Sequence, residues 1–377
     1  MKNKQGADRK RLLILIHGTF ARKAKWTLEG SFFRQNLIKL CKFPSVVETF
    51  EWTGDNSHEA RLTAANDLAE RIRQLTAKFP DSLRHIIAHS HGGNVALYAL
   101  RNHDLRKKIA SVVCLDTPFV GCVARRIKYL RFGLHAFLWT MVVAPLLVAE
   151  VLAYLGFSHP TLLHRASPWL TGFTWTWFFL LIISYSRFER LVHSLFRRQG
   201  EISSRLKLPE STKVPILCIK VRRGEASAYL AFLGRIAEAP YLLWNPVWFV
   251  FLYSVTFALL GFFYRSGPFT SKKLPIVFWV LWPIAALVFS FLSVCLTELA
   301  MLFVPKVVRA HPLGWGWEDF IDNFLVHLSV EKTPPRSNRC VIREYSVGGF
   351  GLKHSLVYSD LTVIQDVAAW LSDDDSL

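Results

Sequence analysis

The sequence lacks any pair of cysteines at the C-x-x-C spacing. Its six cysteines are scattered along the chain as Cys41, Cys114, Cys122, Cys218, Cys295 and Cys340. Thiol-ligated metal sites usually need closely spaced cysteine pairs, so no such site is expected here. Scattered single cysteines are typical of proteins in a reducing compartment.

Acidic residues are scarce as well, because 28 Asp and Glu stand against 46 Lys and Arg, for a formal net charge of +18. The sequence has no zinc-knuckle spacing, basic helix or aromatic RNA-binding signature, so we expect no nucleic-acid partner. The excess positive charge instead indicates attraction to an anionic membrane leaflet, on the order of 1 kcal/mol for each well-placed Lys or Arg.

Long apolar runs are what the sequence has in abundance, and 51% of its residues are hydrophobic. Each of four runs approaches or exceeds the roughly 20 residues that a helix needs to cross a bilayer. Tryptophans lie toward the ends of the runs, where the bilayer interface favours them. We interpret the runs as two transmembrane hairpins, with buried core helices as the alternative: Phe132–Phe157, Pro168–Tyr185, Ala239–Tyr264 and Leu274–Val304.

Basic flanks predict the orientation of these hairpins. RRIKYLR (Arg125–Arg131) precedes the first hairpin and SRFERLVHSLFRR (Ser186–Arg198) follows it, so both of its ends are expected in the cytoplasm. The flanks of the second hairpin are ambiguous, and we place its ends on the same side because the polar domain needs all its parts together. The prediction is a multi-pass protein of the inner, cytoplasmic membrane whose polar domain faces the cytoplasm.

The polar remainder alternates predicted strands with predicted helices, which is typical of a parallel sheet covered on both faces. The hydrophobic segments 125–200 and 239–310 then interrupt one α/β domain made of 1–124, 201–238 and 311–377. The expected strands are Leu12–Ile16, Ser45–Trp52, Arg84–Ala88, Ile109–Leu115, Val214–Val221 and Cys340–Val347, and the expected helices are Ser31–Cys41, Ser57–Phe79, Gly93–Arg101 and Ser359–Leu371.

The stretch LRHIIAHSHGGNVALYAL (Leu83–Leu100) places Ser90 between a predicted strand and a predicted helix. Strand, small-x-Ser-x-Gly and helix together form the pattern of a nucleophile elbow, in which a strained turn holds the serine hydroxyl above the sheet. The small positions are Ala88 and Gly92. Alanine stands where glycine is usual, and its side chain is small enough for the turn.

A nucleophilic serine also needs donors for the oxyanion that forms at a substrate carbonyl. The first strand ends in HGTF (His17–Phe20), where a backbone N–H near Thr19 would face the serine across the carboxyl edge of the sheet. The N–H of His91, directly after the serine, would be the second donor.

The segments IHGTF, IIAHSHGGNVA and LDTPFVG resemble the oxyanion loop, the elbow and a Thr-Pro-Phe segment of the α/β-hydrolase superfamily, in its lipase and esterase branch. The resemblance implies an α/β-hydrolase fold, a mostly parallel sheet with helices on both faces, here interrupted by the two inserted transmembrane hairpins. The first insertion falls where that family carries its substrate lid.

The family's chain order of Ser, acid and His implies the remaining catalytic residues. Glu225 lies in RRGEAS after the strand that ends at Val221, and His354 lies in GGFGLKHSLVYSD after the last strand. Ser90 would attack an acyl carbonyl, His354 would take and return the proton, and Glu225 would orient the imidazole. Other carboxylates remain open as the acid, namely Asp116, Asp319 and Asp322.

Histidines on either side of the serine raise the question of a metal. His89 and His91 would point apart on a sharp turn, and no acidic cluster stands nearby, so we expect no metal and no cofactor. His91 is expected to line the pocket.

The predicted function is a membrane-embedded serine hydrolase that cleaves carboxylic esters of membrane lipids, as a lipase or phospholipase, through an acyl-enzyme. An acyltransferase or protein thioesterase would use the same three residues and is the first alternative. The second alternative is of another class, a membrane scaffold or pore-forming assembly with a hydrolase-like sensing domain.

Overall fold

The computed structural model describes residues 10–41, 43–124, 189–209, 213–222, 325–331, 333–334, 339–348 and 352–373, together with a few isolated positions. The four apolar runs lie outside these residues, except for isolated positions in the second run. Within the described part of the chain, no helix has both the length and the apolar character needed to cross a bilayer. The transmembrane hairpins therefore stay a prediction.

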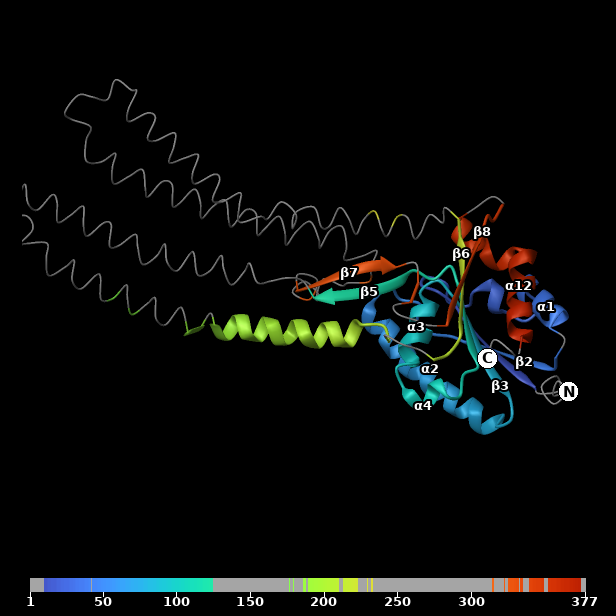
Figure 1. The fold of residues 1–377 in the computed structure, drawn as a ribbon, viewed down its shortest axis with the longest axis horizontal. Helices are drawn as coiled ribbons and strands as arrows, with labels where there is room; N and C mark the ends of the chain where they lie inside the picture. The colour runs from blue at the N-terminus through green and yellow to red at the C-terminus, as the bar shows by residue number, and fades with distance from the viewer. Residues whose placement is uncertain are drawn as a thin grey trace, which may run out of the picture. The chain divides into compact units, whose positions relative to one another are not determined.

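A six-stranded sheet forms the centre of the fold, in the order β2-β1-β3-β4-β6-β8. Every neighbouring pair in it is parallel, which confirms the α/β fold class expected from the sequence (Figure 1). The strands are β1 (Arg11–Ile16), β2 (Ser45–Phe50), β3 (Leu83–His89), β4 (Ser111–Leu115), β6 (Ile216–Val221) and β8 (Cys340–Tyr345).

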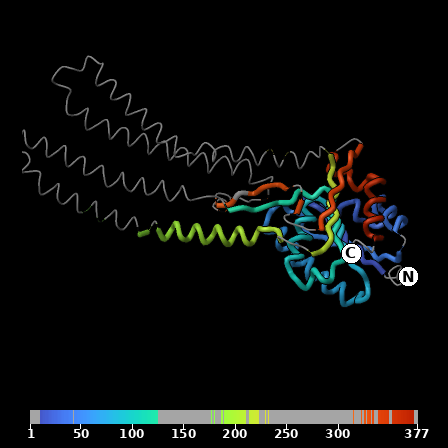
Figure 2. The backbone as a smooth tube through the Cα atoms, viewed as in Figure 1, coloured from blue at the N-terminus to red at the C-terminus, as the bar shows by residue number. Residues whose placement is uncertain are grey.

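Helices cover both faces of this sheet, as the ribbon and the backbone tube show (Figures 1 and 2). Helices α2 (His58–Lys78) and α3 (Gly92–Ala99) pack on one face. Helices α1 (Phe32–Leu40) and α12 (Leu361–Ser372) pack on the other. All six residues of β1 are buried as a result, which is why its sequence is a continuous apolar run rather than an alternating one.

Side chains of the preceding residues fix where the main helices begin. The Ser57 hydroxyl accepts a hydrogen bond from the N–H of Ala60 at 3.0 Å and so caps α2. A carboxylate oxygen of Asp360 does the same for α12, accepting from the N–H of Thr362 at 2.8 Å. Both helices lie within two residues of the predicted boundaries.

Two strands were not predicted from the sequence. β5 (Phe119–Ala124) and β7 (Val326–Glu331) pair with each other in a separate two-stranded sheet. A short helix, α4 (His103–Arg106), follows α3 and was also not expected. The two strands lie about two hundred positions apart in the chain, so local sequence pattern carries no signal for their pairing.

The chain divides into two compact units, and the six-stranded sheet lies in the first. That unit comprises Met1–Val123, Ile202–Ala237 and Pro305–Leu377, and the second comprises Ala124–Glu201 and Glu238–Val304. The five-part division expected from the sequence stays a prediction, because its insertions fall largely outside the described residues.

Candidate active site

The turn between β3 and α3 holds Ser90 in a strained conformation. Its φ is 54°, in the left-handed region that side chains other than glycine seldom adopt. The Ser90 N–H donates to the carbonyl of Leu115 at 2.9 Å, and the Gly93 N–H donates to the carbonyl of Ser90 at 3.0 Å. Ala88 is fully buried in the strand, so the alanine that replaces the usual glycine fits the turn.

Sheet register places the ends of three strands side by side at this turn. Ile16 of β1 pairs with Ala88 of β3, and Leu115 of β4 pairs with His89. The residues that follow these strands therefore meet at one carboxyl edge of the sheet, where α/β proteins usually bind their ligands.

Close contact with β1 makes Gly92 necessary at the start of α3. A Cβ atom at this position would lie 2.6 Å from the carbonyl oxygen of His17 and 2.9 Å from that of Ile16. Both neighbours are backbone atoms and cannot rotate away. The glycine thus lets the elbow helix approach the end of β1.

We expect Gly92→Ala to lower the free energy of unfolding by about 1–3 kcal/mol, because overpacking must displace backbone. Gly200→Ala is the matched control, since it lies in the helix over 189–206 and a Cβ there meets nothing within 4 Å. The control should gain roughly 0.5–1 kcal/mol from higher helix propensity. Thermal unfolding of both variants measures the difference, and equal stability would contradict the packing argument.

The loop after β1 lies directly against the serine. A Cβ on Gly18 would be 2.6 Å from the Cβ of Ser90 and 3.2 Å from its hydroxyl oxygen. Phe20 follows with a φ of 58°, and its N–H donates to the carbonyl of Gly54 at 2.8 Å. The structure therefore brings the loop that contains Thr19 next to the elbow.

Trp52 holds this loop in place, a role that sequence reasoning missed. Its indole N–H donates to the carbonyl of His17 at 2.9 Å, and its backbone N–H donates to Nε2 of the same histidine at 3.3 Å. The remaining nitrogen, Nδ1, donates to the carbonyl of Gly18 at 2.8 Å. These bonds assign the Nδ1–H tautomer to His17 and fix the backbone beside the serine.

A carboxylate and an imidazole meet at the end of β4. Oδ2 of Asp116 lies 2.6 Å from Nδ1 of His354, which belongs to the short helix α11 (Lys353–Leu356). The other carboxylate oxygen accepts from the N–H of Val221 at 3.3 Å, and the N–H of Asp116 donates to the carbonyl of Ile219 at 2.7 Å. Asp116 also has a positive φ, of 46°, as Phe20 and Ser90 do, so backbone strain is concentrated at this edge.

The surroundings keep the Asp116 carboxyl ionised although it is buried. Burial raises its pKa, but the hydrogen bond and charge of His354, the N–H of Val221 and the ammonium of Lys220 lower it more, so the net pKa lies below the ordinary value. Lys220 is held nearby by donating to the carbonyl of Thr117. An ionised carboxylate can accept the Nδ1–H of His354 and fix the tautomer of the ring.

The acid predicted from the sequence, Glu225, lies outside the described residues, as does Asp319. Among the described residues, Asp116 is the carboxylate that contacts His354, and it is one of the alternative acids left open by the sequence. The available signal was its position directly after a predicted strand. What the sequence did not reveal is that β4 is the immediate neighbour of β3 in the sheet.

The histidines beside the serine are buried and point to different partners. Nδ1 of His91 lies 3.1 Å from the side-chain nitrogen of Asn94, whereas Nε2 of His89 lies 3.0 Å from the carbonyl oxygen of His354. Burial lowers the pKa of both, to about 3 for His89. Across the part of the chain that the structure describes, no group of three or more His, Cys, Asp or Glu side chains is arranged to hold a metal ion.

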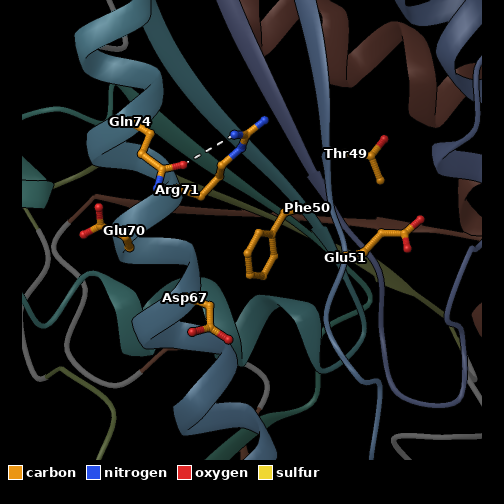
Figure 3. A pocket seen from close by; sticks show the side chains of 7 residues that line it. All are labelled: Thr49, Phe50, Glu51, Asp67, Glu70, Arg71 and Gln74. Atoms are coloured by element: carbon orange, nitrogen blue, oxygen red, sulfur yellow. Dashed lines mark hydrogen bonds between the residues drawn. The ribbon is translucent and has the colours of Figure 1, made fainter.

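A separate hollow of about 410 Å³ lies over β2 and α2 (Figure 3). Its carboxylates are exposed, and Arg71 reaches across to Glu48 at 3.1 Å. None of its residues belongs to the serine, imidazole or carboxylate group described above, so we treat it as a solvated surface groove. It is lined by Thr49, Phe50, Glu51, Asp67, Glu70, Arg71 and Gln74.

One family comparison matches the part of the chain that contains the elbow. The chain matches the alpha/beta hydrolase fold family over residues 52–167, a stretch that contains the elbow. A search of the curated proteins finds no match.

Several solved structures match the chain at low similarity. Lipase B of Aspergillus fumigatus is 21% identical over 33% of this chain and 29% of its own, with a TM-score of 0.25. Bacillus licheniformis lipase BlEst2 in its mature form is 17% identical over 34% of this chain and 49% of its own, with a TM-score of 0.25. MenH from S. aureus is 15% identical over 59% of this chain and 79% of its own, with a TM-score of 0.26.

The chain thus spans less than half the length of either lipase, and the assignment of the fold rests on the sheet order, the elbow and the family match. On these grounds the described core has the α/β-hydrolase fold, and residues 52–167 match that fold family.

Proposed function

We propose that this protein is a serine hydrolase whose catalytic residues are Ser90, His354 and Asp116. The observation that carries the proposal is the 2.6 Å contact between Nδ1 of His354 and the Asp116 carboxylate, at the sheet edge where a left-handed turn presents Ser90. Nucleophile, base and orienting acid are the parts that acyl transfer through a serine requires.

Each group has a defined task in the proposed reaction. Asp116 accepts Nδ1–H and leaves Nε2 of His354 as the nitrogen that takes the proton from the Ser90 hydroxyl. The serine oxygen then attacks the acyl carbonyl and forms a tetrahedral intermediate. Its collapse releases the alcohol, which takes the proton back from His354, and water repeats the sequence on the acyl-enzyme.

Backbone N–H groups of Thr19 and His91 are the proposed oxyanion donors. Among the turn and loop hydrogen bonds of the described residues, none has the backbone N–H of Thr19 or His91 as its donor. Gly18, the residue before Thr19, lies against Ser90, and His91 directly follows that serine. Donors held in place before the reaction stabilise the developing charge without reorganisation.

The proposed substrates are carboxylic esters of membrane lipids. Four long apolar runs and the net charge of +18 support attachment to an anionic bilayer, with the hydrolase domain on the cytoplasmic side. Two exposed apolar side chains next in sequence to proposed site segments support an acyl-chain substrate, since Phe20 follows Thr19 and is 80% exposed and Leu352 precedes α11 and is 65% exposed. Such side chains contact a lipid more favourably than water.

The test uses the full-length protein in lipid nanodiscs. A fluorophosphonate probe should modify one serine, and peptide mass spectrometry should identify it as Ser90. Defined phospholipids and acylglycerols are then offered, and fatty-acid release is followed by mass spectrometry, with probe-blocked protein as the control. Release of free fatty acid supports a lipase. Transfer of the acyl group to another acceptor would show that the protein is an acyltransferase. Folded protein that is not labelled would refute the serine-hydrolase proposal and favour the scaffold alternative.

A further inference from the structure

His89, the residue before the proposed nucleophile, makes a hydrogen bond to the backbone of the proposed base. Its Nε2 lies 3.0 Å from the carbonyl oxygen of His354. A carbonyl oxygen can only accept, so His89 carries its proton on Nε2 and donates it. The last residue of β3 is therefore bonded to α11, which lies more than 250 positions later in the chain.

Aromatic rings hold the His89 ring so that this bond has one geometry. The centroid of His354 lies 4.8 Å away, and Tyr358 meets the ring edge-on at 5.2 Å. Trp26 lies at 6.3 Å and stacks on Tyr358 at 5.6 Å with an interplanar angle of 17°. His89 thus joins the loop after β1, the end of β3 and the segment that carries His354.

The second ring nitrogen of His89 shows that a histidine at this position has an energetic cost. Nδ1 is buried and has no hydrogen-bond partner among the described residues. A buried acceptor without a partner is destabilising, so a histidine is not the most stable side chain for this position. An apolar ring of similar shape, such as that of phenylalanine, would avoid the unpaired nitrogen but would lack the N–H donor at Nε2.

Electrostatics keep His89 a donor while its neighbour changes charge. Burial is the main cause that lowers the pKa of His89 to about 3, and the charges of His354 and His17 lower it further. The hydrogen bond to the His354 carbonyl and the charge of Asp116 raise it, but by less. When His354 takes the serine proton it becomes an imidazolium, and a second positive ring 4.8 Å away would be repelled. His89 therefore remains neutral through the reaction and does not serve as a second base.

We propose that His89 is a positioning residue that fixes His354 through its backbone carbonyl, an inference that rests on the proposed function of Ser90 and His354. Asp116 holds the imidazole from β4, and His89 holds the backbone of the same residue from β3. Because Ser90 directly follows His89, one strand sets the places of both the nucleophile and the base. A misplacement of about 1 Å at such a site costs on the order of 10²-fold in rate.

The experiment compares two substitutions at His89 with a matched control on the same strand. His89→Phe keeps the ring shape and removes the donor, whereas His89→Gln places an amide N–H where Nε2 stood. His85→Phe is the control, because His85 is fully buried on the same face of β3 and bonds Ser111 at 2.9 Å, not the segment of His354.

Ester hydrolysis by the full-length protein in nanodiscs is the first readout. We expect His89→Phe to lower kcat by about 30–100-fold with KM changed less than about threefold. His89→Gln should return kcat to within about fivefold of the wild-type value, and His85→Phe should leave it within about twofold. Equal losses of kcat in both His89 variants, or the same loss in His85→Phe, would reduce His89 to a packing residue.

Amide hydrogen exchange of residues 352–358 is the second readout and does not depend on activity. Exchange there should increase in His89→Phe and stay at the wild-type rate in His89→Gln and His85→Phe. If wild-type protein neither hydrolyses esters nor labels at Ser90, the proposed function fails, and the exchange result still decides whether His89 positions the segment. Unchanged exchange in His89→Phe would overturn the inference whatever the activity.

Discussion

Asp116→Asn lowers kcat for ester hydrolysis by about 10⁴-fold, and Glu225→Gln leaves it within about twofold, if the proposed triad is correct. The asparagine keeps the size of the side chain but replaces the carboxylate oxygen that lies 2.6 Å from Nδ1 of His354. An amide nitrogen at this place would donate to Nδ1 and move the ring proton to Nε2. His354 could then no longer take the serine proton.

Steady-state kinetics of the two variants in nanodiscs decide between the carboxylates. Substitution of the buried Asp116 also risks the fold, so near-UV circular dichroism and thermal unfolding serve as controls. A folded Asp116→Asn protein with near-normal kcat, together with a large loss in Glu225→Gln, would restore the acid that the chain order implied.

The contact between Asp116 and His354 was harder to anticipate from the sequence than the turn at Ser90, for a physical reason. Ser90 sits in a local pattern of strand, tight turn and helix that a few consecutive residues specify. Asp116 becomes the partner of His354 only because β4 lies next to β3, which is a property of sheet order. The acid expected from the chain order, Glu225, follows β6 and lies outside the described residues, so its role stays a prediction.

The same distinction separates the strands that were predicted from those that were not. β1 and β4 are buried on every residue and show as continuous apolar runs, the pattern of a strand covered on both faces. β5 exposes its last two residues and pairs with β7 outside the main sheet. A short strand of this kind is defined by its partner rather than by its own sequence.

Positioning residues were also hidden from the sequence. Trp52 follows β2 by two residues, and its bonds to His17 depend on where β2 lies beside β1. His89 stood out in the sequence only as half of a histidine pair for which no metal was expected, and its partner across the sheet edge had no signal there. Side chains that act through another residue carry no motif, because their spacing in the sequence is unconstrained.

Ser90→Ala should lower kcat by about 10⁶-fold and abolish fluorophosphonate labelling, since the proposed acyl-enzyme forms on the Ser90 oxygen. Its stability should stay close to that of the wild type, because alanine keeps a Cβ and hence the strain of the 54° φ. Ser90→Gly is the informative companion. It removes the nucleophile as well, but glycine adopts the left-handed region without a steric penalty.

We therefore expect Ser90→Gly to unfold at a higher temperature than Ser90→Ala, by the equivalent of about 1 kcal/mol. Both variants lack the serine hydroxyl. Their difference in unfolding stability therefore measures the backbone strain of a side chain at this φ, separately from catalysis. Thermal unfolding in the same nanodiscs measures it. Equal stability of the two variants would mean that the turn stores no strain, whereas retained labelling in either one would place the nucleophile at another serine.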